Sequence, residues 1–255
     1  MKTPENHFKR RLLAKELQIG LWCSLCSNLS AEILGDAGFD WMLLDTEHAP
    51  NELPNILGQL QAMARGTAMP VVRPAWNDTV LIKRLLDVGA QTLLIPFVQN
   101  AEEAARAVAA CQYPPAGVRG ITTGGRAARF GRAPSYLKEA SREICVLVQV
   151  ETMTAIDQIE AIAAVDGVDG IFVGPSDLSA SMGHIGNPLH PEVQRVIEDA
   201  GRRIAACGKV SGILTSAEAD ARRYIEWGYR FVAVGTDIGL LTKHADALAA
   251  SFKKA

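Results

Sequence analysis

The sequence predicts an α/β fold of the (β/α)8 barrel type (a TIM barrel), and three observations lead to that prediction. Short runs rich in Val, Ile and Leu recur along the chain, amphipathic segments with helical spacing separate them, and no extended polar linker interrupts the alternation. Near-continuous hydrophobicity is typical of parallel strands buried on both faces. Eight such units in 255 residues favour closure into one barrel domain, residues 1–255, over the competing doubly wound sheet.

The expected strands are all short and apolar. They are residues 18–24, 40–45, 69–73, 92–96, 145–149, 169–173, 209–214 and 231–235. Helix-start residues precede three of the segments between them: Ser30, Asn77, and His190 before Pro191. Glycines stand where helix C-terminal caps are expected, at Gly38, Gly89, Gly208 and Gly228. An extra helix within residues 4–17 comes before the first strand, and we expect it to close the bottom of the barrel.

Composition and charge exclude several classes of function. Lys and Arg number 26 against 28 Asp and Glu, so the net charge of −2 gives no electrostatic footprint for nucleic acid or an anionic membrane. Five scattered cysteines argue against a disulfide framework and favour a reducing compartment. The first 17 residues carry charges throughout, unlike a signal peptide, and no apolar run approaches the ~20 residues of a membrane span. We expect a cytoplasmic protein.

Polar side chains follow the ends of several expected strands. Asp45, Glu47 and His48 come after the second strand, and Arg73 ends the third. The fifth and sixth strands are followed by further polar residues, namely Gln149 and Glu151, and Ser176 and Asp177. Because the carboxyl ends of barrel strands meet at one mouth, these groups are expected to converge on an active site.

Simpler roles remain open for some of these residues. Asp45 or Glu47 could cap the following helix, and Arg73 could form a structural ion pair with either carboxylate. Glu151 and Asp177 suit a hard divalent cation such as Mg²⁺, which takes one or two protein carboxylates and retains water. No lysine stands at the carboxyl end of an expected strand, so catalysis through a Schiff base is not expected.

Longer segments carry a family resemblance. The chain resembles the metal-dependent pyruvate aldolases of the HpcH/HpaI family over nearly its whole length. The resemblance lies in AGFDWMLLDTEHAPN, PVVRPAWND, LLDVGAQTLLIPFVQNAEEA, YPPAGVRG, VLVQVET and GVDGIFVGPSDLSASMG. It implies reversible cleavage of a 4-hydroxy-2-oxo acid, such as 4-hydroxy-2-oxoheptanedioate, to pyruvate and an aldehyde with Mg²⁺, Mn²⁺ or Co²⁺. It also implies a homohexamer whose C-terminal helices are exchanged between neighbours.

The resemblance further implies roles for individual residues. Glu151 and Asp177 would hold the metal, and Arg73 would stabilise the enolate oxygen. His48 would act as the general base, and Asp87, from the same or a neighbouring subunit, would raise its basicity. The pyruvate half would be bound by Arg73, Gln149, the backbone amides at Ser176 and Asp177, and Leu214.

The aldehyde partner stays open at this point. The loop ITTGGRAARFGR departs from the family pattern, and its arginines, with Arg119, could meet a distal carboxylate. Succinic semialdehyde, tartronate semialdehyde and lactaldehyde are all compatible, the second and third corresponding to 2-keto-3-deoxy sugar acids. Rival interpretations are a lyase of CoA esters or of the phosphoenolpyruvate type on the same barrel, and a non-catalytic metal-dependent binding protein.

Overall fold

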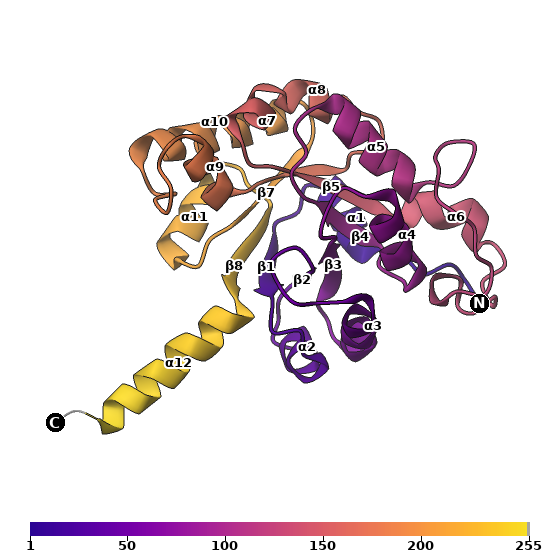
Figure 1. Ribbon diagram of the computed structural model, residues 1–255, viewed down its shortest axis with the longest axis horizontal. Coiled ribbons are helices and arrows are strands. Elements are labelled where there is room, and N and C mark those ends of the chain that lie inside the picture. The colour runs from indigo at the N-terminus through magenta and orange to yellow at the C-terminus, as the bar shows by residue number, and fades with distance from the viewer. Residues whose placement is uncertain (254–255) are drawn as a thin grey trace.

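The computed structural model describes residues 1–253 and contains a closed barrel of eight parallel strands in sequence order (Figure 1). Every predicted strand is present with ends within one residue of the predicted ones. The strands are β1 (Gln18–Cys23), β2 (Trp41–Asp45), β3 (Met69–Arg73), β4 (Thr92–Ile95), β5 (Cys145–Val150), β6 (Gly170–Val173), β7 (Val210–Leu214) and β8 (Phe231–Thr236). The predicted (β/α)8 fold is therefore confirmed.

Helices connect successive strands on the outside of the barrel, and further helices lie before β1 and after β8. They are α1 (His7–Leu13), α2 (Asn28–Gly35), α3 (Leu53–Ala62), α4 (Thr79–Asp87), α5 (Ala101–Cys111), α6 (Tyr136–Glu143), α7 (Met153–Asp157), α8 (Ile159–Ala163), α9 (Pro175–Ser181), α10 (Pro191–Ala206), α11 (Glu218–Glu226) and α12 (Asp237–Phe252), with 3-10 turns η1 (Met63–Arg65) and η2 (Arg126–Ala128). No helix among residues 1–253 is long and apolar enough to cross a membrane.

Two of the three predicted helix-capping residues differ from those in the structure. α2 begins after Ser27, whose side chain accepts from the Ser30 amide, so Ser30 lies inside the helix. α4 begins after Asp78 because its carboxylate accepts from two amides of the first turn, which Asn77 does not do. His190 does cap α10, as predicted.

The predicted N-terminal helix closes the lower end of the barrel. Phe8 and Leu12 of α1 are fully buried, and the Phe8 ring makes edge contacts with Trp41 and Phe231 on the barrel interior. This interior cluster is separate from the larger core between strands and outer helices. The bottom is therefore filled with aromatic packing, which leaves the opposite end for chemistry.

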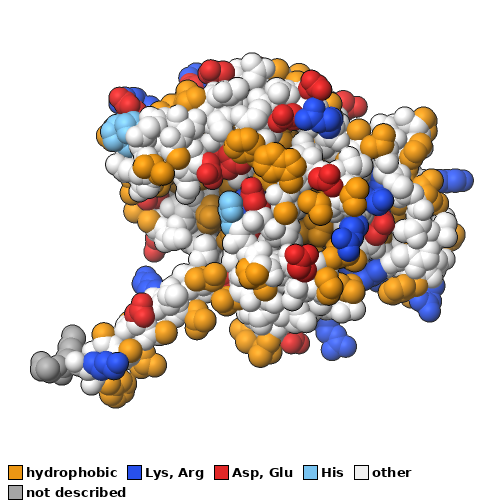
Figure 2. All heavy atoms as spheres, viewed as in Figure 1, with side chains coloured by type: hydrophobic (Ala, Val, Ile, Leu, Met, Phe, Trp, Pro, Cys, Tyr) orange, Lys and Arg blue, Asp and Glu red, His pale blue; other side chains and the backbone are white. Residues whose placement is uncertain are grey.

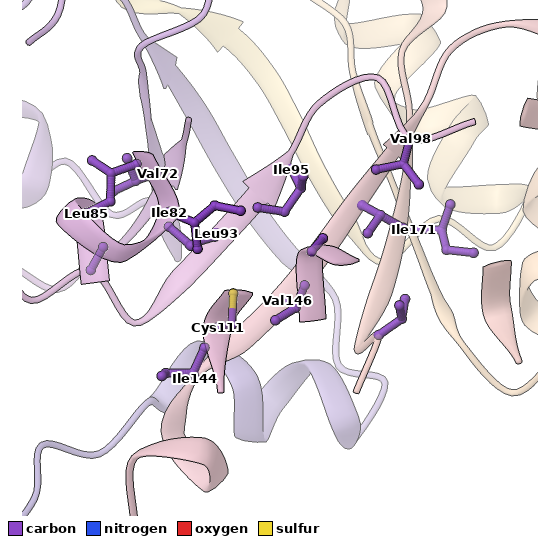
Figure 3. Packing of buried hydrophobic residues seen from close by; sticks show 14 of the residues in the cluster. Val72, Ile82, Leu85, Leu93, Ile95, Val98, Cys111, Ile144, Val146 and Ile171 are labelled. Carbon is purple, nitrogen blue, oxygen red and sulfur yellow. The ribbon is translucent and has the colours of Figure 1, made fainter. Parts of the chain in front are cut away.

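The larger core lies between the strands and the outer helices (Figure 3). Val72 and Leu93 of neighbouring strands pack with Ile82 and Leu85 on the inner face of α4. Gly89, which follows α4, has a φ of +100°, a backbone conformation that favours glycine after a helix. The predicted cap glycines 38, 208 and 228 also have positive φ.

The C-terminal helix α12 projects away from the body of the molecule (Figure 1). Hydrophobic side chains line its length (Figure 2). They include Leu240, Leu241, Leu248 and Phe252, of which Phe252 is 85% exposed. A helix of this kind leaves apolar surface in water unless another chain covers it.

Candidate active site

A cavity of about 570 Å³ opens at the carboxyl ends of the strands. Most of the predicted site residues line it: His48, Arg73, Gln149, Ser176, Asp177 and Leu214. Glu151 hydrogen-bonds to Gln149 at the edge of this cavity, whereas Asp87 lies elsewhere. The convergence expected from strand-end positions is thus present.

Arg73 is buried and held by two carboxylates from β2 and the loop after it. Asp45 and Arg73 are paired in register on β2 and β3, and the Arg73 Nε and Nη2 atoms donate to the two Asp45 oxygens at 2.9 and 2.7 Å. Arg73 Nη1 lies 2.7 Å from a carboxylate oxygen of Glu47. The guanidinium also lies over the Trp22 ring, 4.7 Å from its centroid. Its position at the cavity wall is therefore fixed.

Asp45 organises the loop that carries Glu47 and His48. Besides Arg73, it accepts from the Trp22 indole at 3.2 Å and from the Glu47 amide at 3.0 Å. Burial acts to raise the pKa of Asp45, but the hydrogen bonds and charge of Arg73 outweigh it, so the pKa is lowered. Asp45 is thus an ionised anchor. The structural ion pair that the sequence left open for Arg73 is present with both carboxylates, and Arg73 also lines the cavity wall.

Glu151 has the most strongly shifted pKa among the acidic residues of the site. It follows β5, is 3% exposed, and accepts from the Phe97 amide at 2.9 Å and from Gln149 Nε2 at 2.5 Å. Burial, together with the negative charges of Asp177 and Glu47, raises its pKa to about 7. A carboxylate at Glu151 thus lacks a positive partner strong enough to offset its burial.

A glycine makes room for Glu151. A Cβ built on Gly174, at the end of β6, would lie 2.7 Å from Glu151 Oε2 and 2.8 Å from Glu151 Cβ. Real Cβ atoms essentially never come so close. The side chain of Glu151 therefore occupies space that any residue other than glycine at position 174 would take.

Negative charge gathers around one point of the cavity. Burial raises the pKa of Glu47, opposed by Arg73 and reinforced by Asp45 and Asp177. Glu47 and Asp177 both repel a charge on Glu151, and the guanidinium of Arg73 pairs with Asp45 and Glu47 rather than with Glu151. A cation bound among these carboxylates would relieve this repulsion, which is the expected behaviour of a metal site.

Two further groups at this wall are free to bind a ligand. The side-chain oxygen of Gln149 is buried and has no hydrogen-bond partner, which is unfavourable unless a ligand or ion supplies one. Ser176 and Asp177 lie in the first turn of α9, where backbone amides have no carbonyl of the helix to bind. A small carboxylate in the cavity could accept from these amides.

His48 differs from its neighbours in being accessible. Its side chain is 66% exposed, and its Nε2 lies 3.9 Å from a Glu47 oxygen. An imidazole in this position can exchange protons with solvent and with a molecule in the cavity. Its exposed position also leaves room for a contact from another chain.

Asp87 does not meet His48 within the chain. It is the last residue of α4 and pairs with Arg119 at 3.2 Å, on the outside of the barrel. Arg119 itself is buried, and none of the loop arginines considered for a distal carboxylate lines the cavity. These arginines are Arg119, Arg126, Arg129 and Arg132.

Sequence reasoning missed the distal wall of the cavity. It is formed by Pro188 and Leu189 before α10 and by Asp220 and Tyr224 of α11. These residues are not at strand ends, and their types are ordinary for helices and loops, so nothing in their spacing marks them. No lysine lines the cavity among residues 1–253, in agreement with the expectation against Schiff-base chemistry.

Comparison with known proteins gives a consistent picture. The family model described as HpcH/HpaI aldolase/citrate lyase matches residues 18–244. A protein named pyruvate aldolase from Rhizobium etli is 57% identical over 252 residues, covering 99% of both chains. A 4-hydroxy-2-oxo-heptane-1,7-dioate aldolase from Klebsiella pneumoniae is 58% identical over 248 residues, covering 97% of this chain and 94% of that protein. A solved HpcH/HpaI aldolase/citrate lyase family protein from Burkholderia cenocepacia is 39% identical, with a TM-score of 0.95 over 98% of this chain and all of that one.

Proposed function

The chain belongs to the HpcH/HpaI aldolase/citrate lyase family, and from that premise we propose that it is a class II pyruvate aldolase. It is a carbon–carbon lyase that cleaves a 4-hydroxy-2-oxo acid into pyruvate and an aldehyde and catalyses the reverse condensation. The observation that carries this proposal is Glu151, whose pKa is raised by burial and by neighbouring negative charge, and which accepts a hydrogen bond from Gln149. The side-chain oxygen of Gln149 has no partner, and Gln149 lines one cavity with Arg73 and His48.

The acidic residues fit a divalent cation. Glu151 and Asp177 would be its protein ligands, and two carboxylates with open positions for water and substrate suit Mg²⁺, Mn²⁺ or Co²⁺. When bound, the cation acts as a Lewis acid that polarises the keto oxygen of the substrate. Deprotonation of Glu151 is needed for binding, so the cation and a proton compete for this carboxylate.

The remaining groups hold the pyruvate half of the substrate. The Gln149 side chain and the amides of Ser176 and Asp177 would bind its carboxylate end. Leu214, at the end of β7, would contact its apolar side. Arg73, which Asp45 and Glu47 keep in place, would donate to the keto oxygen as negative charge develops there.

His48 would supply the base. In cleavage its imidazole removes the 4-hydroxyl proton, the C3–C4 bond breaks, and the aldehyde forms at C4. The electron pair of the broken bond moves into C2–C3 and gives the enolate of pyruvate, which a proton from solvent converts to pyruvate. In condensation the same proton returns from His48 to the new alkoxide.

A second chain would complete this arrangement. The exposed apolar residues of α12, including Leu241 and Phe252, support a homo-oligomer in which another protomer covers them, and a hexamer is the proposed form. Because Asp87 lies outside the cavity of its own chain, its proposed effect on His48 requires a neighbouring protomer. Size-exclusion chromatography with light scattering tests the assembly, with Leu241→Glu expected to weaken it.

The metal proposal is tested by removal and replacement. After chelation, activity should disappear, and Mg²⁺, Mn²⁺ or Co²⁺ should restore it. Glu151→Gln and Asp177→Asn should prevent that recovery, whereas Glu102→Gln, an exposed carboxylate on α5, should leave it unchanged. Near-native recovery in either ligand variant would show that the ligands are assigned wrongly.

The aldehyde is tested with a panel. The two named relatives carry different substrate names, so kcat/KM for condensation of pyruvate with succinic semialdehyde, tartronate semialdehyde and lactaldehyde decides the preference. Borohydride added with pyruvate should trap no lysine adduct. Cleavage of a CoA ester without any condensation of pyruvate with these aldehydes would overturn the proposed function.

A further inference from the structure

Outside the active site, three metal-ligating side chains meet between α9 and α10. His184 Nε2 lies 3.0 Å from a carboxylate oxygen of Glu192, and the rings of His184 and His190 stack with centroids 3.6 Å apart and an interplanar angle of 15°. One ligand atom from each residue lies within 4.8 Å of the others. Histidine side chains are visible at this end of the molecule (Figure 2).

The backbone holds this cluster in place. The His184 amide donates to Ser179 of α9, and the His190 amide donates to Asn187. Gly183 and Gly186 have φ values of +82° and +75°, which let the segment turn tightly between these bonds. The backbone positions of the two histidines are thus set by local structure before any ligand binds.

The cap of α10 leaves coordinating capacity in the cluster. His190 Nδ1 accepts from the Glu192 amide at 3.3 Å, so its Nε2 is not used by the cap. In a tetrahedral zinc site with bonds of about 2.0–2.1 Å, neighbouring ligand atoms lie roughly 3.3 Å apart. The 3.0 Å between His184 Nε2 and the Glu192 carboxylate is close to that spacing. Because an imidazole binds a metal ion in the plane of its ring, the His190 ring must turn out of its stack on His184 to direct Nε2 at the same ion.

We propose that His184, His190 and Glu192 form a second metal site, for a first-row transition cation such as Zn²⁺ or Co²⁺. Two imidazoles and one carboxylate select such an ion over Mg²⁺, which prefers oxygen ligands. Glu192 is 55% exposed, so water can occupy the fourth position. This site differs in chemistry from the all-carboxylate site at Glu151 and does not depend on it.

The location gives the site a structural consequence. Pro188 and Leu189, which lie between the two histidines, line the distal wall of the active-site cavity. The Pro188 carbonyl also accepts from Gln194 of α10. A cation joining His184 to the start of α10 closes the segment 184–192 into a loop and braces this wall.

The test counts Zn²⁺ in the full-length protein. After chelation and Zn²⁺ loading, the wild type should hold two ions per chain by atomic emission, and Asp177→Asn should retain one. Adding His184→Ala or Glu192→Gln to Asp177→Asn should remove that ion or weaken its binding by about tenfold or more. Losing a residue that only hydrogen-bonds to a metal ligand already weakens metal binding by about tenfold, so losing a ligand should cost at least as much. His7→Ala, at an exposed histidine of α1, is the matched control and should change nothing.

Two further measurements keep this proposal separate from the aldolase. Zn²⁺ should slow amide hydrogen exchange in residues 183–192 of the wild type but not of His184→Ala. Mg²⁺-supported turnover should be equal in those two proteins, so a failure of the aldolase proposal would leave this test unaffected. Zn²⁺ binding in Asp177→Asn that neither His184→Ala nor Glu192→Gln weakens would overturn the second site.

Discussion

The carboxylate of Asp45 accepts two hydrogen bonds, of 2.9 and 2.7 Å, from the guanidinium of Arg73, and the two residues occupy paired positions on β2 and β3. Both side chains are almost fully buried. The pair therefore links the stability of the barrel to the orientation of a proposed catalytic group.

Breaking this pair should destabilise the protein. Asp45→Asn leaves the Arg73 charge buried with Glu47 as its remaining acidic partner, and removal of one member of a buried pair typically costs about 3–5 kcal/mol. Urea unfolding at fixed protein concentration measures this loss. Glu218→Gln, which breaks an exposed pair with Arg222 on α11, is the control and should not shift the midpoint. Equal midpoints for the two variants would contradict the structural role of Asp45.

Arg73 and His48 should be separable by isotope exchange. Arg73→Lys removes a donor aimed at the developing oxyanion, an effect of typically ~10²–10³ in kcat, and should depress both cleavage and exchange of the pyruvate methyl protons in D₂O. His48→Ala removes a general base worth ~10²–10⁴ and should depress cleavage more than exchange, because water can accept a methyl proton from bound pyruvate.

Proton NMR of pyruvate alongside the cleavage rate makes this comparison. His7→Ala is again a suitable control, since His7 is exposed on α1 at the closed end of the barrel. If His48→Ala loses exchange and cleavage equally, one base serves both steps. Unchanged cleavage in His48→Ala would remove that residue from the mechanism.

The metal-free protein should lose stability as pH rises toward neutrality. In the folded protein the pKa of Glu151 is raised from 4.5 to about 7, so between those values the folded state binds a proton that the unfolded state has released. The free energy of unfolding therefore falls with rising pH in this window, by up to about 3 kcal/mol.

Thermal or urea unfolding from pH 4.5 to 8, with chelator present, measures this decline in the wild type and in Glu151→Gln. The variant should lack most of this decline, and Mg²⁺ should reduce it in the wild type, because a ligand that binds only the folded state stabilises it. Parallel pH profiles for the two proteins would mean that Glu151 ionises normally.

Gly174→Ala should weaken metal activation without unfolding the barrel. The added Cβ would displace the Glu151 carboxylate, so the Mg²⁺ concentration for half-maximal activity should rise. Gly35→Ala is the control, since a Cβ there meets only Met63 at 3.9 Å on the outer side of the barrel. An unchanged Mg²⁺ dependence in Gly174→Ala would show that Glu151 has room to move.

Much of the site follows from strand-end positions alone. A strand buried on both faces must be apolar, so a polar residue at its end is conspicuous, and closure of the barrel brings such residues together. His48, Arg73, Gln149 and Asp177 were predictable in this way because each follows or ends an apolar run. The helix starts at Ser27 and Asp78 were harder to predict from the sequence, since neighbouring residues were equally good candidates for capping.

The sequence by itself determined the barrel, the order of its strands and the residues at its mouth, because apolar periodicity and chain order are local properties. Only the tertiary structure decided that Arg73 pairs with both Asp45 and Glu47 and that the pKa of Glu151 is raised to about 7. It also decided that α11 and the segment before α10 form the distal wall. Those features depend on distances between segments far apart in the chain and on the removal of water around charged groups. Both arise only when the eight strands close.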